Sequence, residues 1–325
     1  NLVDGTVASG IATATGTLTS SDVDTGATKA WSIIGTPSAT YGGIVINSAT
    51  GVWTYSLDNT LATTQALTEN QVVTQSYTAR VIDDKGAYGD QIIIITITGI
   101  NDTPTVSKGA ASATLIEDGG IRNAILGTSI STILLNKGDV DGTVNYDVSF
   151  LTTNGWATFN AGVTYSKAGN YGTATLTIAT NVLTYVLDNS ASSTQALTAG
   201  QSVSDSFTLQ VTDTAFTSSI VPVFAIIGSN DAPELTAPAF PTYTDTANLD
   251  SFSNTIGNFA GTDVDSSSPY SFGIQGVTIH GSFTQAGTYG VLSVTTAGAF
   301  SLFNCVSVMA VSKPKFTITA NLKPS

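Results

Sequence analysis

The chain has 325 residues and a formal net charge of −13, from 23 acidic and 10 basic side chains. This length suits two to four domains, and the negative charge excludes nucleic acid and anionic lipid as partners, because both bind basic surfaces. All but three of the acidic residues are Asp, which belongs in turns and in oxygen cages for hard cations. Together with abundant Thr, Ser, Gly and β-branched residues, this composition predicts a nearly all-β protein.

A single cysteine, Cys305, excludes an intrachain disulfide. Bound metal is then the expected staple for a large extracellular protein. The longest apolar run, 92–100, is too short to cross a bilayer, so we expect a strand there and no membrane insertion. The chain starts at Asn1 without a secretion signal, and we expect it to be a piece of a longer protein.

The first predicted unit covers residues 1–102. Residues 52–57 alternate with the period of two that is typical of a strand, and Asp58 with Asn59 then turns the chain. We interpret Asp58, and its counterpart Asp188, as turn caps whose side chains bond to the backbone. The segment TQALTENQ is too short for a full helix, so we expect a helical turn that places Leu67 in the core.

The second predicted unit, 103–231, repeats the first at an offset of 130 or 129 residues, and the third, 232–325, repeats it incompletely. The repeated motifs are Tyr-Gly at 41, 171 and 289, Leu-Asp-Asn at 57 and 187, Thr-Gln-Ala-Leu at 64 and 194, and Asn-Asp-x-Pro at 101 and 230. Asp-Val-Asp at 22, 139 and 263 precedes Tyr-Gly by 19, 32 and 26 residues, so a loop of variable length lies between them. Short strands between Gly, Asn and Asp turns predict tandem immunoglobulin- or cadherin-like β-sandwiches in a linear array.

The order of these motifs resembles the VCBS family of cadherin-like repeats in RTX-type bacterial surface adhesins. The first unit matches the family pattern at Gly16–Leu18, Asp22, Asp24, Tyr41–Gly42, Gly51–Asn59, Gln65–Leu67, Val81–Asp83 and Asn101–Pro104. The second unit has Asn181, Val182 and Leu183 where the family has Gly and Trp, and the third departs after Phe303. The resemblance covers about nine tenths of the chain.

The resemblance implies an extender that holds an adhesin away from the cell in a biofilm, secreted to the cell surface by a type I system and dependent on calcium. The implied partners are calcium ions, neighbouring repeats, and a surface glycan or protein bound by domains outside this piece. Residues 304–325 lack the expected Leu-Asp-Asn and Gln-Ala-Leu motifs. They are either a divergent strand or an artefact.

The repeated Asp-x-Asp pairs are the candidate metal ligands. A hard divalent cation takes six to eight oxygens, and two neighbouring carboxylates at a strand end repel each other unless a cation lies between them. A later Asp and a closing Asn-Asp accompany the first two pairs. The predicted Ca²⁺ ligands are Asp22, Asp24, Asp83, Asn101, Asp102, Glu117, Asp139, Asp141, Asp213, Asn230, Asp231, Asp263 and Asp265.

We expect these ligands to meet at two junctions between sandwiches. At the first junction, Asp83, Asn101 and Asp102 are expected to meet Glu117, Asp139 and Asp141. At the second junction, Asp213, Asn230 and Asp231 are expected to meet Asp263 and Asp265.

Catalysis is not expected. The single histidine, His280, gives the first two units no Ser-His-Asp or Cys-His set, and carboxylate pairs that recur in every unit are not typical of a glycosidase. A calcium-dependent carbohydrate-binding module stays open, with a stacking platform drawn from Trp31, Trp53, Trp156, Tyr41, Tyr165 and Tyr171. A self-assembling sheath or filament subunit also stays open, with strand pairing through 92–97.

Overall fold

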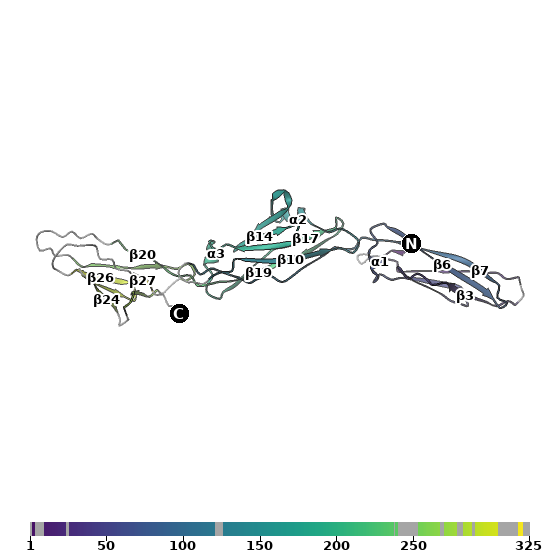
Figure 1. Ribbon diagram of the computed structural model, residues 1–325, viewed down its shortest axis with the longest axis horizontal. Helices are drawn as coiled ribbons and strands as arrows, with labels where there is room; N and C mark the ends of the chain where they lie inside the picture. The colour runs from purple at the N-terminus through teal and green to yellow at the C-terminus, as the bar shows by residue number, and fades with distance from the viewer. Residues whose placement is uncertain are drawn as a thin grey trace.

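A computed structural model describes residues 2–3, 10–23, 26–120, 126–236, 238–239, 253–266, 270–277, 282–287, 290–304 and 318–320. The regular structure of the described part is mostly strands, which form β-sandwiches placed end to end in a long, narrow molecule (Figure 1). It contains three hydrophobic clusters, within 14–97, 106–226 and 235–302. The predicted all-β class with tandem immunoglobulin- or cadherin-like sandwiches is confirmed, while the unit boundaries stay a prediction.

The first sandwich packs the sheet β2-β5-β4 against the sheet β1-β7-β6-β3. Only β1 and β7 pair in parallel; the other neighbours are antiparallel. Its elements are β1 (Leu2–Val3), β2 (Thr13–Thr17), β3 (Lys29–Ile34), β4 (Gly42–Ile46), β5 (Val52–Leu57), α1 (Ala62–Gln65), β6 (Val72–Asp83) and β7 (Tyr88–Thr98).

Strand β7 shows how the period of two builds this sandwich. Ile93, Ile95 and Ile97 face the core, whereas Ile92 and Ile94 face outward with 58% and 65% of their surface exposed. Strand β6 pairs along the whole length of β7, so one of the two edges of this apolar strand is covered. The predicted strand over 92–100 is therefore confirmed up to Thr98.

The second sandwich contains a six-stranded sheet, β12-β13-β14-β15-β10-β8, and two three-stranded sheets, β11-β17-β18 and β16-β19-β9. The added strands β12 and β13 come from the longer loop before Tyr-Gly, which projects from the middle of the molecule (Figure 1). The elements are β8 (Thr105–Lys108), β9 (Leu115–Ile116), β10 (Ile130–Gly138), β11 (Asn145–Tyr146), α2 (Val148–Thr153), β12 (Ala157–Phe159), η1 (Asn160–Gly162), β13 (Thr164–Ala168), β14 (Gly172–Thr177), β15 (Val182–Leu187), α3 (Ser192–Gln195), β16 (Ser202–Ser206), β17 (Leu209–Thr212), β18 (Thr217–Ile220) and β19 (Val223–Ile227).

The first two sandwiches fill the same cross-strand position with different pairs of side chains. Gly16 on β2 lies opposite Trp53 on β5, and a Cβ atom on Gly16 would come within 2.5 Å of the Trp53 ring. The corresponding pair in the second sandwich is Ile133 opposite Leu183. Leu183 therefore replaces Trp53 because Ile133 occupies the space that Gly16 leaves open. Gly51 is replaced by Asn181, which keeps the positive φ of that turn, at 55° against 72°.

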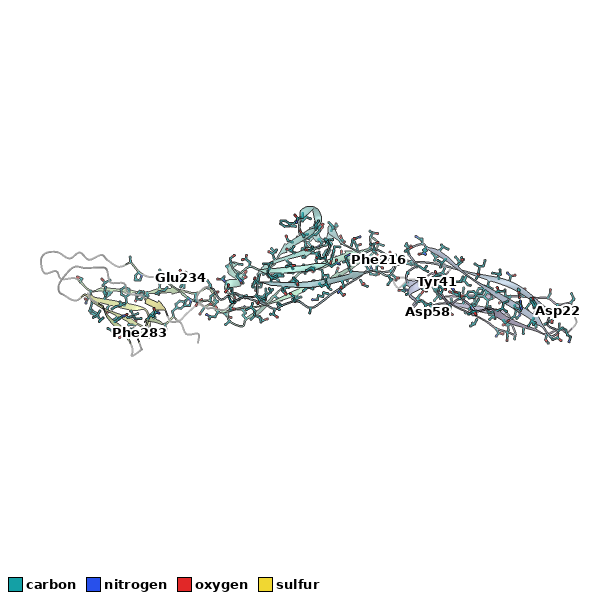
Figure 2. The ribbon with its side chains drawn as sticks, in the orientation of Figure 1. Asp22, Tyr41, Asp58, Phe216, Glu234 and Phe283 are labelled. Carbon is teal, nitrogen blue, oxygen red and sulfur yellow. The ribbon has the colours of Figure 1, made fainter. Side chains whose placement is uncertain are left out.

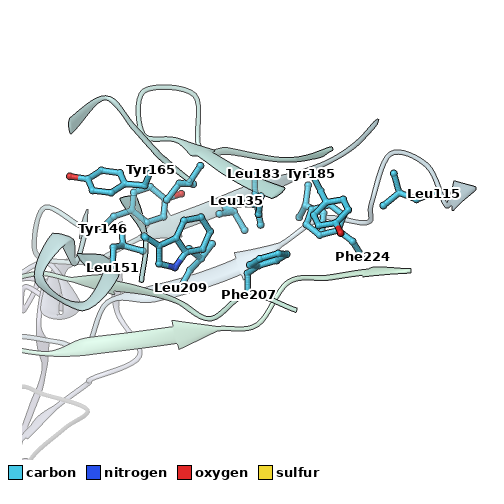
Figure 3. Close-up of a cluster of buried hydrophobic side chains, with 14 of the residues drawn as sticks. Leu115, Leu135, Tyr146, Leu151, Tyr165, Leu183, Tyr185, Phe207, Leu209 and Phe224 are labelled. Carbon is cyan, nitrogen blue, oxygen red and sulfur yellow. The ribbon is translucent and has the colours of Figure 1, made fainter. Parts of the chain in front are cut away.

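The core of the second sandwich is rich in aromatic rings (Figure 3). The ring of Tyr185 stacks on Phe224 with centroids 4.9 Å apart, and Phe207 lies 5.8 Å from Tyr185. The buried Tyr185 hydroxyl donates to Asp205 Oδ2 at 2.6 Å. Asp205 also accepts backbone N–H groups at 3.0 Å, so its burial is matched by hydrogen bonds.

The Thr-Gln-Ala-Leu motifs form the expected helical turns. Helices α1 and α3 have four residues each, and the leucines that follow them, Leu67 and Leu197, are buried in the first and second cores. The Leu-Asp-Asn aspartates cap turns as predicted. Asp58 accepts from Thr60 N at 2.9 Å, and Asp188 accepts from Ser190 N at the same distance.

The third sandwich is described only in part. It contains the sheet β21-β26-β25-β24 and the pairs β20-β22 and β23-β27. Its elements are β20 (Glu234–Thr236), β21 (Thr255–Asn258), β22 (Ala260–Thr262), β23 (Phe272–Ile274), β24 (Ser282–Gly287), β25 (Gly290–Thr295), β26 (Ala299–Asn304) and β27 (Ile318–Ala320). Cys305, His280 and residues 305–317 and 321–325 lie outside the described residues.

Candidate metal centres at the sandwich junctions

The first junction joins the end of β7 to the loops that begin the second sandwich. Asn101 and Asp102 follow β7, and Asp102 N–H donates to Asp141 Oδ2 at 3.3 Å. The Asn101 side-chain amide donates to Asp213 Oδ2 at 2.6 Å and to the Asp102 carbonyl at 2.7 Å. The closing Asn-Asp of one sandwich therefore touches both the Asp-Val-Asp motif and a hairpin carboxylate of the next.

Carboxylates at the first junction are buried and face one another. Asp139 Oδ2 and Asp141 Oδ1 are shielded from solvent and have no hydrogen-bond partner within the described residues. Burial, together with hydrogen bonding to Asp139 and the charges of Asp139 and Asp102, raises the pKa of Asp141 to about 6. Uncompensated carboxylate oxygens of this kind are what a bound cation would satisfy.

Asp213 reaches the first junction from the hairpin between β17 and β18. Its Oδ1 accepts the backbone N–H groups of Ala215 at 2.8 Å and Phe216 at 2.6 Å, which fixes the carboxylate at the hairpin tip. Burial pushes the pKa of Asp213 upward, but hydrogen bonds from Phe216, Asn101 and Ala215 outweigh burial and leave that pKa below its ordinary value. Asp213 is therefore ionised at neutral pH, as a cation ligand must be.

The second junction repeats the geometry of the first. Asp231 N–H donates to Asp265 Oδ2 at 3.2 Å, and the Asn230 amide donates to the Asp231 carbonyl at 2.5 Å. Asp231 Oδ2, Asp263 Oδ1 and Asp265 Oδ1 are buried without a hydrogen-bond partner within the described residues. The same Asn-Asp to Asp-Val-Asp contact thus occurs twice in the chain.

Glu117 adds a fully buried carboxylate to the second junction. Its Oε2 accepts Ser229 N–H at 3.1 Å, and its Oε1 has no hydrogen-bond partner within the described residues. Burial raises the pKa of Glu117 to about 7, the Ser229 N–H acts in the opposite direction, and the charges of Asp231 and Asp265 add to the rise. An isolated buried carboxylate is costly, so this side chain requires either a proton or a nearby cation.

The neighbouring aspartates carry the same electrostatic signature. Burial raises the pKa of Asp231, and the charges of Asp265 and Asp118 add to the rise. Burial also raises the pKa of Asp263 to about 6, with Asp265 as the main further cause. Ionisation of several carboxylates at one junction without a counter-ion therefore destabilises the folded chain.

A pocket of about 270 Å³ lies beside these carboxylates, lined by Asp231, Asp263, Glu234 and the glycines 119 and 120. Gly120 has a φ of 73°, and a Cβ atom there would come within 3.1 Å of Asp231 Oδ1. Glycine at this position therefore leaves room around the carboxylate oxygen.

Three predicted ligands lie elsewhere than expected. Asp83 ends β6 at the opposite end of the first sandwich from Asn101, because β6 is twelve residues long. Asp213, its counterpart, contacts Asn101 at the first junction instead of the second. Glu117 belongs to the second junction instead of the first, because β9 runs parallel to β19 and carries it to Ser229.

The Asp-Val-Asp motif of the first unit lies apart from both junctions. Asp22 is exposed at the free end of the first sandwich, as Figure 2 shows, and Asp24 lies outside the described residues. Glu69 was not predicted, yet its Oε2 accepts Asn101 N–H at 2.8 Å. The only signal in the sequence is that Glu69 is one of three glutamates in the chain.

The donor set fits a hard cation. Within the described residues no group of three or more His, Cys, Asp or Glu side chains is arranged closely enough to form a ready-made metal site. The buried carboxylate oxygens without partners, the absence of nitrogen and sulfur donors among them and the raised pKa values nonetheless suit Ca²⁺. Asp102, Asp139, Asp141 and Asp213 would hold it at the first junction, and Glu117, Asp231, Asp263 and Asp265 at the second.

The aromatic rings give no support to a sugar-stacking platform. Trp31, Trp156 and Tyr165 are buried, with 5%, 2% and 3% of their surface exposed. Trp53 packs against the first core over Gly16. Tyr41 and Tyr171 are half-buried and pack against the first and second cores. Rings that pack into a core do not form a flat, exposed platform for a glycan.

No protein-family model matches the chain, and no curated protein matches it. In the described residues no helix has the length and apolar character needed to cross a membrane.

Among solved structures, the chain is similar to domains 3–6 of protocadherin gamma B7, described as a cis-dimer. The identity is 15% over 94% of this chain and 64% of that chain, at a TM-score of 0.41. It is also similar to domains 22–24 of mouse cadherin-23, with 11% identity over 88% and 79% of the two chains and a TM-score of 0.38. For domains 1–4 of Drosophila N-cadherin the identity is 11%, the coverage 86% and 59%, and the TM-score 0.31. The chain thus spans less than two thirds of the protocadherin and N-cadherin chains.

Proposed function

We propose that this chain is a non-catalytic extender region of a large secreted bacterial adhesin, stiffened by calcium at the junctions between its sandwiches. The observation that carries the proposal is the repeated junction contact. At both junctions an Asp N–H after Asn donates to the second Asp of an Asp-Val-Asp motif, at 3.3 and 3.2 Å. In the part of the chain that the structure describes, buried carboxylate oxygens without a hydrogen-bond partner lie beside that contact each time.

The electrostatics of the junctions support calcium as the stiffening agent. Without a cation, the carboxylates of neighbouring sandwiches repel one another across each junction, so the two sandwiches separate or tilt. A cation between them turns this repulsion into attraction that links the two bodies. Extracellular modules bind calcium with a Kd of about 10⁻⁴–10⁻³ M, and calcium at 100 times Kd stabilises each site by about 2.7 kcal/mol.

The role is mechanical. A sequence of sandwiches held end to end by several ions places a distal binding domain at a fixed distance from the cell. In this proposal the adhesin is exported by a type I system and acts in cell adhesion and biofilm formation, and the adhesive target is bound by another part of the protein.

Small-angle scattering of the chain in millimolar calcium and in excess chelator tests the proposal. We expect a larger maximum dimension and a narrower distance distribution with calcium, and a melting temperature that rises with calcium concentration. Magnesium at the same concentration is the control, because it prefers small octahedral sites that keep several waters. Identical scattering and melting in calcium and chelator would refute calcium stiffening.

A further inference from the structure

The insertion of the second sandwich widens one particular sheet. Strands β12 and β13 come from the longer loop before Tyr-Gly, and they extend the sheet that contains β14, β15 and β10. The equivalent sheet of the first sandwich, β2-β5-β4, has three strands. The insertion therefore adds two strands on the side of the molecule from which the loop projects (Figure 1).

The outer face of β12-β13-β14-β15-β10 carries no ionisable side chain. Lys167 and Lys137 are the only charged residues on these five strands, all of which the structure describes. Lys167 pairs with Ala174, which is fully buried, and Lys137 pairs with Val106, which packs against the core. Because side chains alternate along a strand and directly paired residues share a face, both lysines belong to the inner face.

Hydroxyl and aliphatic side chains fill this outer face in ordered rows. Val186 lies opposite Ile130, and Val182 lies opposite Leu134 on the same two strands. Ile130, Leu134 and Val186 leave 56%, 53% and 45% of their surface exposed. Covering such aliphatic groups with a partner is favourable. Between the two aliphatic pairs a row of hydroxyls crosses the sheet, formed by Ser166, Thr175, Thr184 and Thr132.

The absence of charge on this face decides which partner suits it. A strongly basic or acidic partner gains no electrostatic attraction there, and a glycan platform needs exposed aromatic rings, of which these strands offer one, Phe159. Two copies of a chain with a net charge of −13 repel each other wherever their carboxylates meet. An uncharged face is the place where two such copies can touch without that repulsion.

The rows are also self-complementary under a two-fold axis. When the axis runs along the row of hydroxyls, the row of one copy meets the row of the other. The Ile130–Val186 pair of each copy then covers the Leu134–Val182 pair of the second copy. Aliphatic groups thus meet aliphatic groups, and hydroxyls, which both donate and accept hydrogen bonds, meet hydroxyls.

We propose that the outer face of β12-β13-β14-β15-β10 is a self-association surface, through which two copies of the chain pack face to face. Five strands about 4.8 Å apart and about 17 Å long give a footprint of about 400 Å². A standard stable interface takes about 800 Å² from each partner, so the dimer is weak. The surface goes beyond calcium stiffening, because it uses none of the junction carboxylates.

Sedimentation velocity of the whole chain from about 10 µM to about 1 mM tests this surface. We expect a monomer–dimer equilibrium within that range. Val186→Lys should weaken dimerisation by about tenfold or more, because it places a charge inside the contact. Thr173→Lys, opposite Val186 on β14, is a second variant of the same face and should act in the same way.

The matched control is Val223→Lys on β19, in another sheet of the same sandwich. Val223 is 42% exposed, close to the 45% of Val186, and both variants add the same positive charge. Val223→Lys should change dimerisation by less than about twofold. All three variants should melt within about 2 °C of the parent chain, which shows that they are folded.

A monomer throughout the concentration range would overturn the surface. Equal losses from Val186→Lys and Val223→Lys, or association that continues past the dimer, would overturn it as well. Raising the salt concentration from about 0.05 to 0.5 M should preserve or strengthen the dimer, because salt screens the repulsion between acidic chains. Dissociation by salt would contradict an uncharged contact.

Measurement in both calcium and chelator separates this proposal from calcium stiffening, because the dimer is expected in both. A dimer that forms only in calcium would assign the contact to the carboxylates and contradict the surface. Calcium stiffening is judged separately, from the scattering of the monomer at low concentration.

Discussion

The two junctions share one frame and differ in the carboxylate that completes it. In both, Asn-Asp of one sandwich meets Asp-Val-Asp of the next at nearly the same distance. The first junction adds Asp213, held at a hairpin tip, and the exposed Glu69. The second adds Glu117, which is completely buried and belongs to the sandwich that precedes the junction.

This difference teaches that the shared motif fixes the position of the junction, while the completing carboxylate sets how strongly the site demands a counter-charge. Hydrogen bonds hold the pKa of Asp213 low, so its charge is tolerated without a cation. Burial holds the pKa of Glu117 near 7, so its charge is not. We therefore expect the second junction to lose more stability than the first when calcium is removed.

The largest expected effect comes from neutralising one Asp-Val-Asp pair at a time. Asp139→Asn with Asp141→Asn should abolish the calcium-linked stabilisation of the first junction, about 2.7 kcal/mol for each ion bound at 100 times Kd. Asp263→Asn with Asp265→Asn should do so at the second. Calorimetry across a calcium titration measures both. If each double variant weakened both junctions equally, the two sites would not be independent.

Glu117→Gln tests whether the buried charge of Glu117 destabilises the second junction when no cation is present. Glutamine keeps an acceptor for Ser229 N–H but removes the charge, so the chain in chelator at about pH 7.5 should gain about 1–3 kcal/mol of stability. In calcium the same variant should bind more weakly at the second junction. Glu69→Gln is the exposed control and should change stability in chelator by less than about 0.5 kcal/mol. If Glu117→Gln lowered the stability of the chain in chelator, the buried Glu117 charge would not be destabilising.

The pH dependence of the calcium-free chain distinguishes Glu117, which is found only at the second junction, from the aspartates that the two junctions share. Burial raises the pKa of Glu117 from its ordinary value to about 7, and it raises the pKa of Asp141 and of Asp263 to about 6. Because the folded pKa values are raised, these groups contribute stability that is complete below about pH 4 and is lost as pH rises through 6 and 7. Melting in chelator should fall by about 2–4 °C or more between pH 5 and 8.

Calcium should abolish or reverse that slope, because it stabilises the ionised carboxylates. Glu117→Gln should remove the part of the loss near pH 7 and leave the part near pH 6. A melting temperature in chelator that rises steadily from pH 5 to 8 would refute the raised pKa values.

The smallest expected effect distinguishes two equivalent hairpin aspartates. Asp83 and Asp213 each accept two backbone N–H groups within their own hairpin, so Asp83→Ala and Asp213→Ala lose the same local bonds. Only Asp213 also bonds to Asn101 across a junction. Asp213→Ala should therefore cost about 1 kcal/mol more, measured by thermal unfolding. Equal losses would mean that the inter-sandwich bond contributes nothing.

Much of the fold follows from local patterns in the sequence. Period-two alternation, the turn caps Asp58 and Asp188 and the helical turns before Leu67 and Leu197 depend on neighbours in the chain, so the sequence alone predicts them. The contact between Asn-Asp and Asp-Val-Asp was also predictable, because each unit repeats both motifs.

The assignment of Asp83, Asp213 and Glu117 to junctions was wrong because it depends on the direction and length of strands. A strand of twelve residues spans about 40 Å, which carries Asp83 from one end of the sandwich to the other. The short parallel pairing of β9 with β19 carries Glu117 past its own entry junction. Neither the length of β6 nor the pairing of β9 can be read from the spacing of the motifs.

The placement of Asp83 and Asn101 at opposite ends of one sandwich gives the molecule a polarity. In the first two sandwiches, one end offers a hairpin carboxylate and an Asp-Val-Asp pair and the other end offers Asn-Asp, so a join is between unlike faces. Contacts between unlike faces extend in one direction and do not close into symmetric pairs. Each added unit therefore lengthens the array head to tail, and two arrays meeting tail to tail have no complementary face to share.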